Sequence, residues 1–335
     1  MISCLRGAAV AVDEVHVGVW ENELHRWNAG LSTLARLASA EARLLTRAVS
    51  AQCDALIVGY PGHLDLPAAR RAARGRPVVF NPLVSLADTF VGDRRRFGPR
   101  SPAARMLELV DRRALAAADL VVADTQAHAD FFASLTNTPI DVCFVGAEDA
   151  VFRPGWNPEN PFTVLFVGKL IPLHGIEVVL EAACLAPELR FRIIGSGQLE
   201  HALVRKPSNV DHVRWVDYAQ LPAELQHAGC ALGVFGTTAK AQRVIPNKAF
   251  QALACGTPLV TADTPAAREL VADGESALLI PPGDAAALAT AVRRLADDDG
   301  LRQRLAAGGR STYEQRASET VLGARWRGLL ERLVH

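Results

Sequence analysis

The sequence predicts an α/β protein built from two doubly wound parallel-sheet domains. Short apolar runs alternate with helical patterns along almost all of the 335 residues. Most of these runs are apolar throughout, which is typical of parallel strands that are covered on both faces. A chain of this length can bury two separate hydrophobic cores.

The apolar runs predict the strands one by one. In the first half they are Val15–Val19, Ala55–Gly59, Pro77–Phe80, Leu120–Ala123 and Val142–Val145. In the second half they are Thr163–Val167, Arg190–Ile194, Val213–Val216, Ala231–Phe235, Pro258–Thr261 and Ala277–Ile280. Helical patterns lie between them, for example Gly175–Ala186 and Asp284–Leu295.

A proline-rich linker, Ala147–Pro161, separates the two halves, because its three prolines interrupt both periodicities. We expect an N-terminal domain over 1–150, a second domain over 151–315 and a final amphipathic helix over 316–335, near Glu314–Leu333. The opening CLRGAAVAVDEVHV resembles a first helix that runs into the next strand. We therefore expect that the usual first strand is missing or lies upstream.

Composition excludes several classes of protein. Lysine plus arginine equals aspartate plus glutamate, at 36 each, so no overall field favours nucleic acid. No apolar run reaches the roughly 18 residues of a membrane span, and the first residues lack the apolar core of a signal peptide. The six cysteines form no CxxC pair, so we expect reduced thiols, no metal site and a cytoplasmic protein.

Two segments predict an anion site. The first, FTVLFVGKLIPLHG from Phe162 to Gly175, is a predicted strand followed by a loop with Lys169 and then a helix. The second, PNKAFQALACGTPLV from Pro246 to Val260, is a predicted helix that carries Lys248 near its start. A helix N-terminus offers free N–H groups and partial positive charge, so the expected ligand bears phosphate.

Four blocks in order, GKLIPLHG, RFRIIGSGQLE, PNKAFQALACGTPLV and ARELVADGESALLIPPGD, resemble glycosyltransferase family four, retaining nucleotide-sugar enzymes with the GT-B fold. The resemblance implies transfer of a sugar from a nucleotide diphosphate sugar to an unknown acceptor. It also implies that the second domain binds the nucleotide and the first binds the acceptor. No metal and no cofactor besides the donor are expected.

The resemblance assigns Lys169 and Lys248 as the clamp on the diphosphate and as catalytic groups. It places further donor-binding residues at Gly168, His174, Gly175, Gly195, Gly197, Tyr218, Arg243, Asn247 and Gln251. For Gly195 and Gly197 a purely structural turn is an open alternative, and Tyr218 either stacks near the base or forms only the wall of the cleft.

The chain departs from the family pattern around the second segment. His174 stands where the family has lysine, Gln251 stands in place of the second of two glutamates, and Arg243 stands near the first. No aspartate or glutamate occurs between Glu224 and Asp263. These departures put the usual contact to the donor sugar in question.

In the first domain, His63, Asn81 and His128 follow predicted strands and are expected at the cleft. His63 and His128 are candidate catalytic contacts to the sugar or acceptor. The Arg94–Arg113 region belongs to a segment, Asp93 to Ala114, with seven arginines against three acids. It is either a solvated face or a peripheral contact with an anionic membrane or a phosphorylated lipid.

Two alternatives to the transferase stay open. The missing glutamates and the short start favour a non-catalytic GT-B protein that binds or activates a partner enzyme. A nucleotide-sugar epimerase or a sugar-phosphate synthase on the same fold would keep the nucleotide site and change the acceptor. Titration with nucleoside diphosphates, followed by an assay of nucleotide-sugar hydrolysis, separates these hypotheses.

Overall fold

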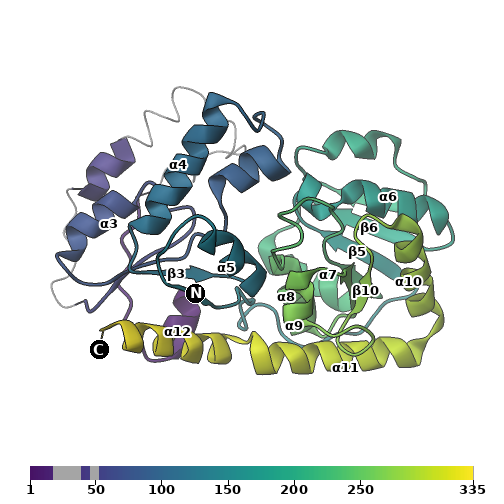
Figure 1. Cartoon of the computed structure of the whole chain (residues 1–335). Coiled ribbons are helices and arrows are strands. Elements are labelled where there is room, and N and C mark those ends of the chain that lie inside the picture. The colour runs from purple at the N-terminus through teal and green to yellow at the C-terminus, as the bar shows by residue number, and fades with distance from the viewer. Residues whose placement is uncertain (18–38, 46–52, 335) are drawn as a thin grey trace.

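The computed structural model describes residues 1–17, 39–45 and 53–334, and shows two α/β domains side by side (Figure 1). The two longest C-terminal helices, α11 (Asp299–Arg316) and α12 (Glu319–Val334), run along one side of both domains. None of the helices in the described ranges combines the length and the apolar character that a membrane-spanning helix needs.

The first domain is built on a four-stranded parallel sheet in the order β1-β2-β3-β4. The strands are β1 (Leu56–Val58), β2 (Val78–Phe80), β3 (Leu120–Ala123) and β4 (Ile140–Val142). The helices that flank this sheet are α3 (Leu66–Ala73), α4 (Pro102–Ala116) and α5 (Gln126–Ala133). Strands β2 and β3 are fully buried, as continuous apolar runs predict.

The second domain has a six-stranded parallel sheet in the order β10-β9-β8-β5-β6-β7. Its strands are β5 (Thr163–Val167), β6 (Arg190–Ile194), β7 (Val210–Val213), β8 (Cys230–Leu232), β9 (Leu259–Ala262) and β10 (Leu278–Ile280). Its helices are α6 (Ile176–Leu185), α7 (Leu221–His227), α8 (Asn247–Cys255), α9 (Pro265–Leu270) and α10 (Ala285–Asp297), followed by α11. Separate apolar clusters cover the two faces of this sheet.

The predicted doubly wound parallel sheets are confirmed, and two strands are displaced. Strand β4 ends at Val142, because its partner β3 ends at Ala123 and gives no further pairing. Beyond it, Val145 packs against the core of the second domain, and Phe144 packs against the cores of both domains. Strand β7 ends at Val213, opposite the last residue of β6, and Trp215 beyond it is 76% exposed.

The N-terminal segment differs from the predicted strand Val15–Val19. Residues 15–17 lie outside any strand, and residues 18 and 19 lie outside the described residues. The chain instead opens with helix α1 (Ile2–Gly7), which packs against α12.

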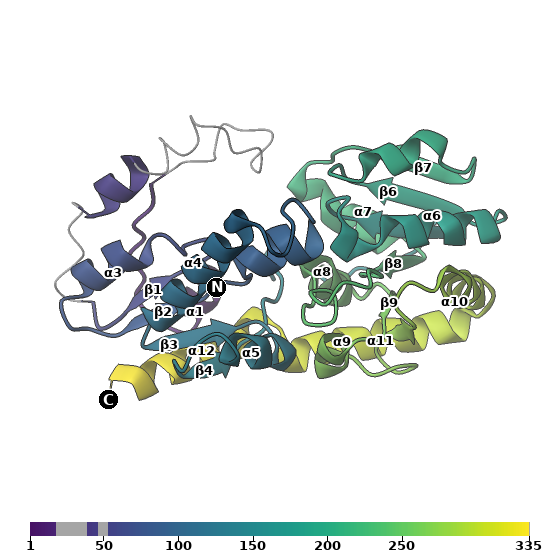
Figure 2. The same ribbon diagram turned by 45° about the horizontal axis from the view of Figure 1, so that its top comes forward.

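The predicted final helix is interrupted at Ala317, so α11 and α12 are separate helices. Helix α12 packs on the first domain, where Leu322, Trp326 and Leu329 are buried against α1 and the sheet (Figure 2). Gly323 allows the close approach, because a Cβ there would lie 2.3 Å from the Cys4 carbonyl oxygen. Arg325 and Arg332 of α12 both pair with Asp141 of β4.

Candidate functional site

The loop from β5 to α6 is held by its backbone against two other turns of the second domain. Gly168 and Leu170 donate N–H groups to the carbonyls of Ile194 and Ser196. Gly175 has φ +67, and a Cβ there would lie 2.7 Å from the carbonyl carbon of Phe235. Glycine is therefore needed where the loop enters α6.

Gly195 and Gly197 form the turn on the other side of this loop. Their φ values are +148 and +155, and a Cβ on Gly195 would lie 1.9 Å from the Gly168 carbonyl oxygen. A Cβ on Gly197 would lie 2.7 Å from the Leu170 carbonyl oxygen. These contacts favour the structural-turn interpretation that the sequence left open, and their ligand contacts stay a prediction.

Lys248 is a buried cation directly behind the loop. It lies in the first turn of α8, is 7% exposed, and its Nζ is 3.6 Å from the centre of the Phe166 ring. Within the described part of the chain, Nζ has no hydrogen-bond partner. Burial lowers the pKa of Lys248 well below its ordinary value, because the charged form loses hydration.

His174 connects Lys169 and Lys248, the two lysines of the predicted diphosphate clamp. Its Nδ1 donates to the Lys169 carbonyl oxygen over 2.6 Å, which fixes the neutral tautomer. Its pKa is lowered well below the ordinary value by burial and by the nearby charges of Lys248, Arg94 and Lys240. Lys169 itself is exposed at the start of the loop. The structure thus brings Gly168, Lys169, His174 and Lys248 together.

Gln251 lies one turn after Lys248 and contacts Tyr218. The Tyr218 hydroxyl donates to Glu148 over 3.2 Å, and its ring meets Phe152 edge-on. Burial, then the charge of Glu148, raises the pKa of Tyr218 to about 12. The linker carboxylate of Glu148 therefore lies near Gln251, which the sequence did not indicate. Asn247 is exposed at the start of α8.

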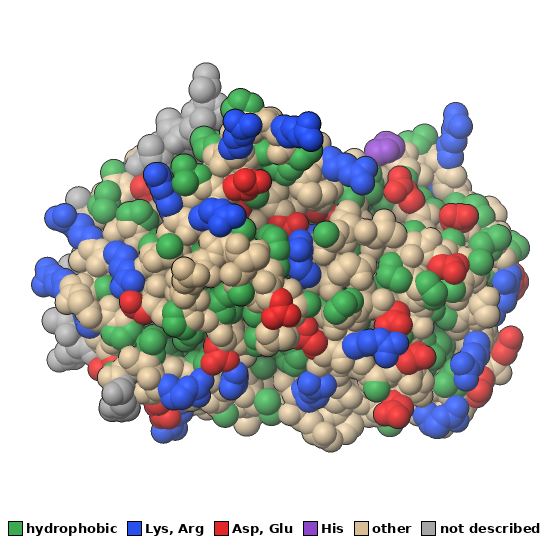
Figure 3. Space-filling view, viewed as in Figure 1, with side chains coloured by type: hydrophobic (Ala, Val, Ile, Leu, Met, Phe, Trp, Pro, Cys, Tyr) green, Lys and Arg blue, Asp and Glu red, His purple; other side chains and the backbone are tan. Residues whose placement is uncertain are grey.

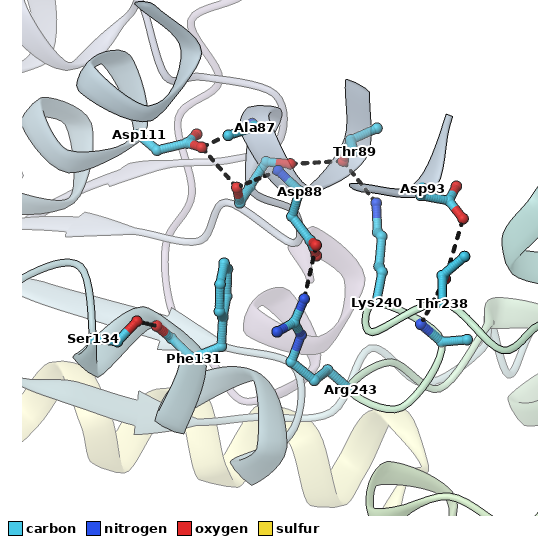
Figure 4. A network of polar contacts seen from close by, with 12 residues as sticks. Ala87, Asp88, Thr89, Asp93, Asp111, Phe131, Ser134, Thr238, Lys240 and Arg243 are labelled. Carbon is cyan, nitrogen blue, oxygen red and sulfur yellow. Dashed lines mark hydrogen bonds and ion pairs between the residues drawn. The ribbon is translucent and has the colours of Figure 1, made fainter. Parts of the chain in front are cut away.

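Arg243 reaches into the first domain. Its guanidinium pairs with Asp88 over 2.7 Å and lies 4.0 Å from the centre of the Phe131 ring (Figure 4). Nearby, the Lys240 Nζ donates to the Thr89 hydroxyl over 2.7 Å. The segment that looked purely cationic in the sequence is thus faced by carboxylates of the first domain.

His63 and Asn81 are occupied inside the first domain. The His63 Nε2 lies 3.3 Å from Asp111, and its Nδ1 lies 3.0 Å from the Pro61 carbonyl oxygen. The Asn81 amide donates to the Val122 carbonyl oxygen over 2.7 Å. These contacts favour a packing role, and their expected convergence on the acceptor stays a prediction.

His128 differs from these two residues. Its Nδ1 lies 2.6 Å from the Asp124 carboxylate, and its ring stacks on Phe132. Its Nε2 is buried and has no partner among the residues that the structure describes. Of the three polar groups expected at the strand ends, His128 is the one with an unused ring nitrogen.

Sequence reasoning missed the segment around Asp88–Asp93. Asp93 is 1% exposed, and lies near its neighbour Arg94 and near Thr238 and Lys240 across the boundary between the domains. Over residues 1–17, 39–45 and 53–334, no group of three or more histidine, cysteine or acidic side chains is placed to hold a metal ion.

Comparisons with known proteins support the fold. Residues 161–298 match the family model described as Glycosyl transferases group 1. A D-inositol 3-phosphate glycosyltransferase of Nocardioides sp. is 29% identical over 250 residues, which are 62% of this chain and 52% of the relative. The chain spans about half the length of the curated relatives it matches, with 52%, 40% and 41% for three of them.

Solved structures give the same architecture. Sucrose-phosphate synthase from Thermosynechococcus elongatus superposes with a TM-score of 0.72 at 18% identity, over 90% of this chain and 78% of that one. HepE of Anabaena in complex with UDP-glucose superposes with a TM-score of 0.68 at 18% identity, over 91% and 84%. The chain therefore has the GT-B fold, and its residues 161–298 are similar to the glycosyl transferases group 1 family.

Proposed function

We propose that this protein is a metal-independent glycosyltransferase. It transfers a sugar from a nucleotide diphosphate sugar to an acceptor with retention at the anomeric carbon. The observation that carries this proposal is Lys248, a buried ammonium without a hydrogen-bond partner in the described chain, beside the glycine loop and the start of α8. A diphosphate is the ligand that satisfies both the cation and the N–H groups at that helix start.

The chemistry follows from where charge develops. As the bond from the anomeric carbon to the phosphate oxygen breaks, the leaving diphosphate gains negative charge. Lys248 in its low-dielectric setting and Lys169 at the loop stabilise this charge more in the transition state than in the ground state. The acceptor oxygen forms the new bond on the same face, and its proton passes to the departing phosphate oxygen.

His174 can add a positive charge when the diphosphate is bound. Without ligand it is neutral, because burial and neighbouring cations lower its pKa. An incoming diphosphate opposes those cations, so His174 can take up a proton and donate to the phosphate. This supports histidine as a replacement for the lysine of the family loop.

Titration calorimetry with UDP, GDP and ADP tests the proposal, followed by an assay of the matching nucleotide sugars in excess chelator. Binding together with hydrolysis or transfer supports the enzyme, and the anomeric form of the product by NMR tests retention. Binding without any turnover favours the non-catalytic GT-B alternative. Absence of binding to all three diphosphates would refute a nucleotide-sugar site.

We also propose that this protein is cytoplasmic and touches an anionic lipid surface through the Arg94–Arg113 region. Two of the three acids of its segment, Asp93 and Asp111, are buried, whereas most of the arginines are exposed. Met106 and Leu109 on α4 are 60% and 46% exposed. Figure 3 shows basic side chains beside hydrophobic ones over the part of the first domain where α4 lies.

Basic residues near an anionic bilayer contribute about 1 kcal/mol each, so this face favours binding to acidic lipids. Flotation with phosphatidylglycerol vesicles should recover the protein at low salt, and flotation with phosphatidylcholine vesicles should not. Arg100→Glu/Arg105→Glu should abolish recovery, whereas Arg294→Glu on the second domain should not. Equal recovery of all three proteins would show that the face is only solvated.

A further inference from the structure

Buried polar atoms without partners gather at the boundary between the domains. In the described parts of the chain, six such atoms occur: Asp88 Oδ2, Asp93 Oδ2, Arg94 Nε, His128 Nε2, Arg243 Nε and Lys248 Nζ. Buried polar atoms in native proteins nearly always have partners, and exceptions call for an explanation. Because they cluster at one place, they indicate a common ligand rather than scattered imperfections.

The first-domain members come from one unusual segment, η1 (Asp88–Asp93), which is a π-helix. Such turns are rare and are frequent at functional sites. Leu83 before it and Arg95 after it have positive φ values of 57 and 51, which non-glycine residues adopt at a cost. The backbone therefore holds Asp88, Asp93 and Arg94 at the boundary under local strain.

Each carboxylate accepts a hydrogen bond through one oxygen, and its other oxygen accepts none from the residues that the structure describes. Asp88 Oδ1 accepts from Arg243 over 2.7 Å, and Asp93 Oδ1 accepts from the Thr238 hydroxyl over a long 3.4 Å. The Asp93 Oδ2 forms a long ion pair with the Arg94 Nε over 3.6 Å, which is beyond hydrogen-bond distance. Each free oxygen can accept a hydrogen bond from a ligand that carries O–H groups.

These carboxylates lie next to the diphosphate site. Gln198, next to the Gly195–Gly197 turn, donates to the Arg94 carbonyl oxygen over 3.1 Å, and the charges of Lys248, Arg94 and Lys240 all lower the pKa of His174. Burial lowers the pKa of Lys240, and the charges of Asp88 and Asp93 partly oppose this shift. Figure 4 shows Asp88, Asp93, Lys240 and Arg243 facing one another across the domain boundary. A glycosyl group attached to the β-phosphate would therefore extend from Lys248 toward these carboxylates.

We propose that Asp88 and Asp93 of the first domain bind the hydroxyl groups of the transferred glycosyl group. This inference rests on the proposed function and names the residues that recognise the sugar. Sugar hydroxyls donate to carboxylates in charge-assisted hydrogen bonds, which are stronger than neutral ones. In this chain Arg243 does not supply an acceptor itself but holds Asp88 in place.

A different explanation is that the same ion pairs only hold the domains together. The test therefore compares each nucleoside diphosphate with its own sugar conjugate: UDP with UDP-glucose, GDP with GDP-mannose, and ADP with ADP-glucose. The ratio of the two dissociation constants isolates the contribution of the sugar. For the pair that binds, Asp93→Asn should weaken binding of the sugar conjugate by at least about tenfold. It should weaken binding of the free diphosphate much less.

Thr238→Ala is the matched control, because it removes the protein partner of Asp93 and keeps the carboxylate. A domain-holding role predicts that Thr238→Ala and Asp93→Asn act alike, with equal losses for both ligands, and this outcome would overturn the inference. If Asp93→Asn does not fold, Asp88→Asn gives the same ratio test. Failure of the wild type to bind any diphosphate or conjugate would overturn the proposed function and this inference with it.

Discussion

Replacing Lys248 by methionine should stabilise the ligand-free protein and weaken diphosphate binding at the same time. Methionine has nearly the same length as lysine, fills the space over the Phe166 ring, and makes favourable sulfur–aromatic contacts. It lacks the ammonium, which is buried and has no hydrogen-bond partner in the described part of the chain. The substitution therefore separates the cost of the buried charge from the packing of the side chain.

The gain in stability can be worked out from these contacts. A buried donor without a partner costs about 1–3 kcal/mol, and the cation–π contact with Phe166 returns about 0.5–2 kcal/mol. The net gain is about 1 kcal/mol, which raises the melting temperature by about 1–2 °C in a protein of this size. Loss of a charge-assisted contact costs about 1.5–3 kcal/mol in binding, so diphosphate affinity should fall about 10–100-fold.

The stability gain should also depend on pH. Because burial lowers the pKa of Lys248 below 10.5, the unfolded state binds more protons between the lowered value and 10.5. Wild-type stability therefore rises with pH across this window, and the part of the Lys248→Met advantage that comes from the buried charge is lost by about pH 10.5. Binding of diphosphate favours the charged lysine, so the wild type should take up protons on binding and the variant should take up fewer.

Thermal unfolding over a range of pH measures the stability and its pH dependence. Calorimetry in buffers of different ionisation enthalpy measures the diphosphate affinity and the number of protons taken up on binding. Lys169→Met is the control, because it removes an exposed lysine and should change stability by less than about 0.5 kcal/mol. A Lys248→Met protein that is less stable than the wild type, or that binds diphosphate equally well, would refute the reasoning. Equal losses for the nucleoside and its diphosphate would also refute the assignment of Lys248 to the diphosphate.

Three further predictions follow from the same site and from the C-terminal helix. Excess chelator should leave diphosphate binding and turnover unchanged, and a strict requirement for manganese or magnesium would contradict the lysine clamp. Gln251→Glu should preserve or strengthen nucleotide binding, since a carboxylate accepts stronger hydrogen bonds from ribose hydroxyls; loss of folding would instead assign Gln251 to packing. Deletion from Thr320 onward should uncover the apolar surface that Leu322, Trp326 and Leu329 bury, and should increase dye binding. In solution scattering, saturating nucleotide should reduce the radius of gyration of the full chain but not of the truncated one.

The sequence predicted what is encoded locally. Strands such as Thr163–Val167 were found to the residue, because both faces of the sheet are buried and the run is apolar throughout. The surroundings of Lys248 were predictable for the same reason, since strand, glycine loop and helix start are each short local patterns. Val145 misled the strand assignment, because its burial comes from the other domain and not from the sheet.

The partners of Arg243 could not be predicted, because they depend on how the domains meet. Asp88 is 155 residues away in the chain, and its segment carries no motif that marks it. The same holds for Glu269 of α9, whose carboxylate accepts from the N–H groups of Gln126 and Ala127 at the start of α5. Thr125 adds a hydrogen bond to the Arg243 carbonyl oxygen. These contacts hold the first domain against the second, and no local sequence pattern predicts them.

Charges of both signs meet at this boundary. Lys169 and Lys248 lie at the glycine loop and the start of α8, whereas Asp88 pairs with Arg243 and Asp93 accepts from Thr238. A donor is anionic at its diphosphate and carries hydroxyl donors at its sugar, so it opposes cations at one end and carboxylates at the other. In this arrangement of the domains, both groups include buried atoms that lack hydrogen-bond partners among the described residues, at a cost of about 1–3 kcal/mol for each atom. A ligand that satisfies both ends removes this cost, whereas a bare diphosphate leaves the carboxylates unsatisfied. Closure of the domains should therefore be more complete with the sugar conjugate than with the diphosphate alone.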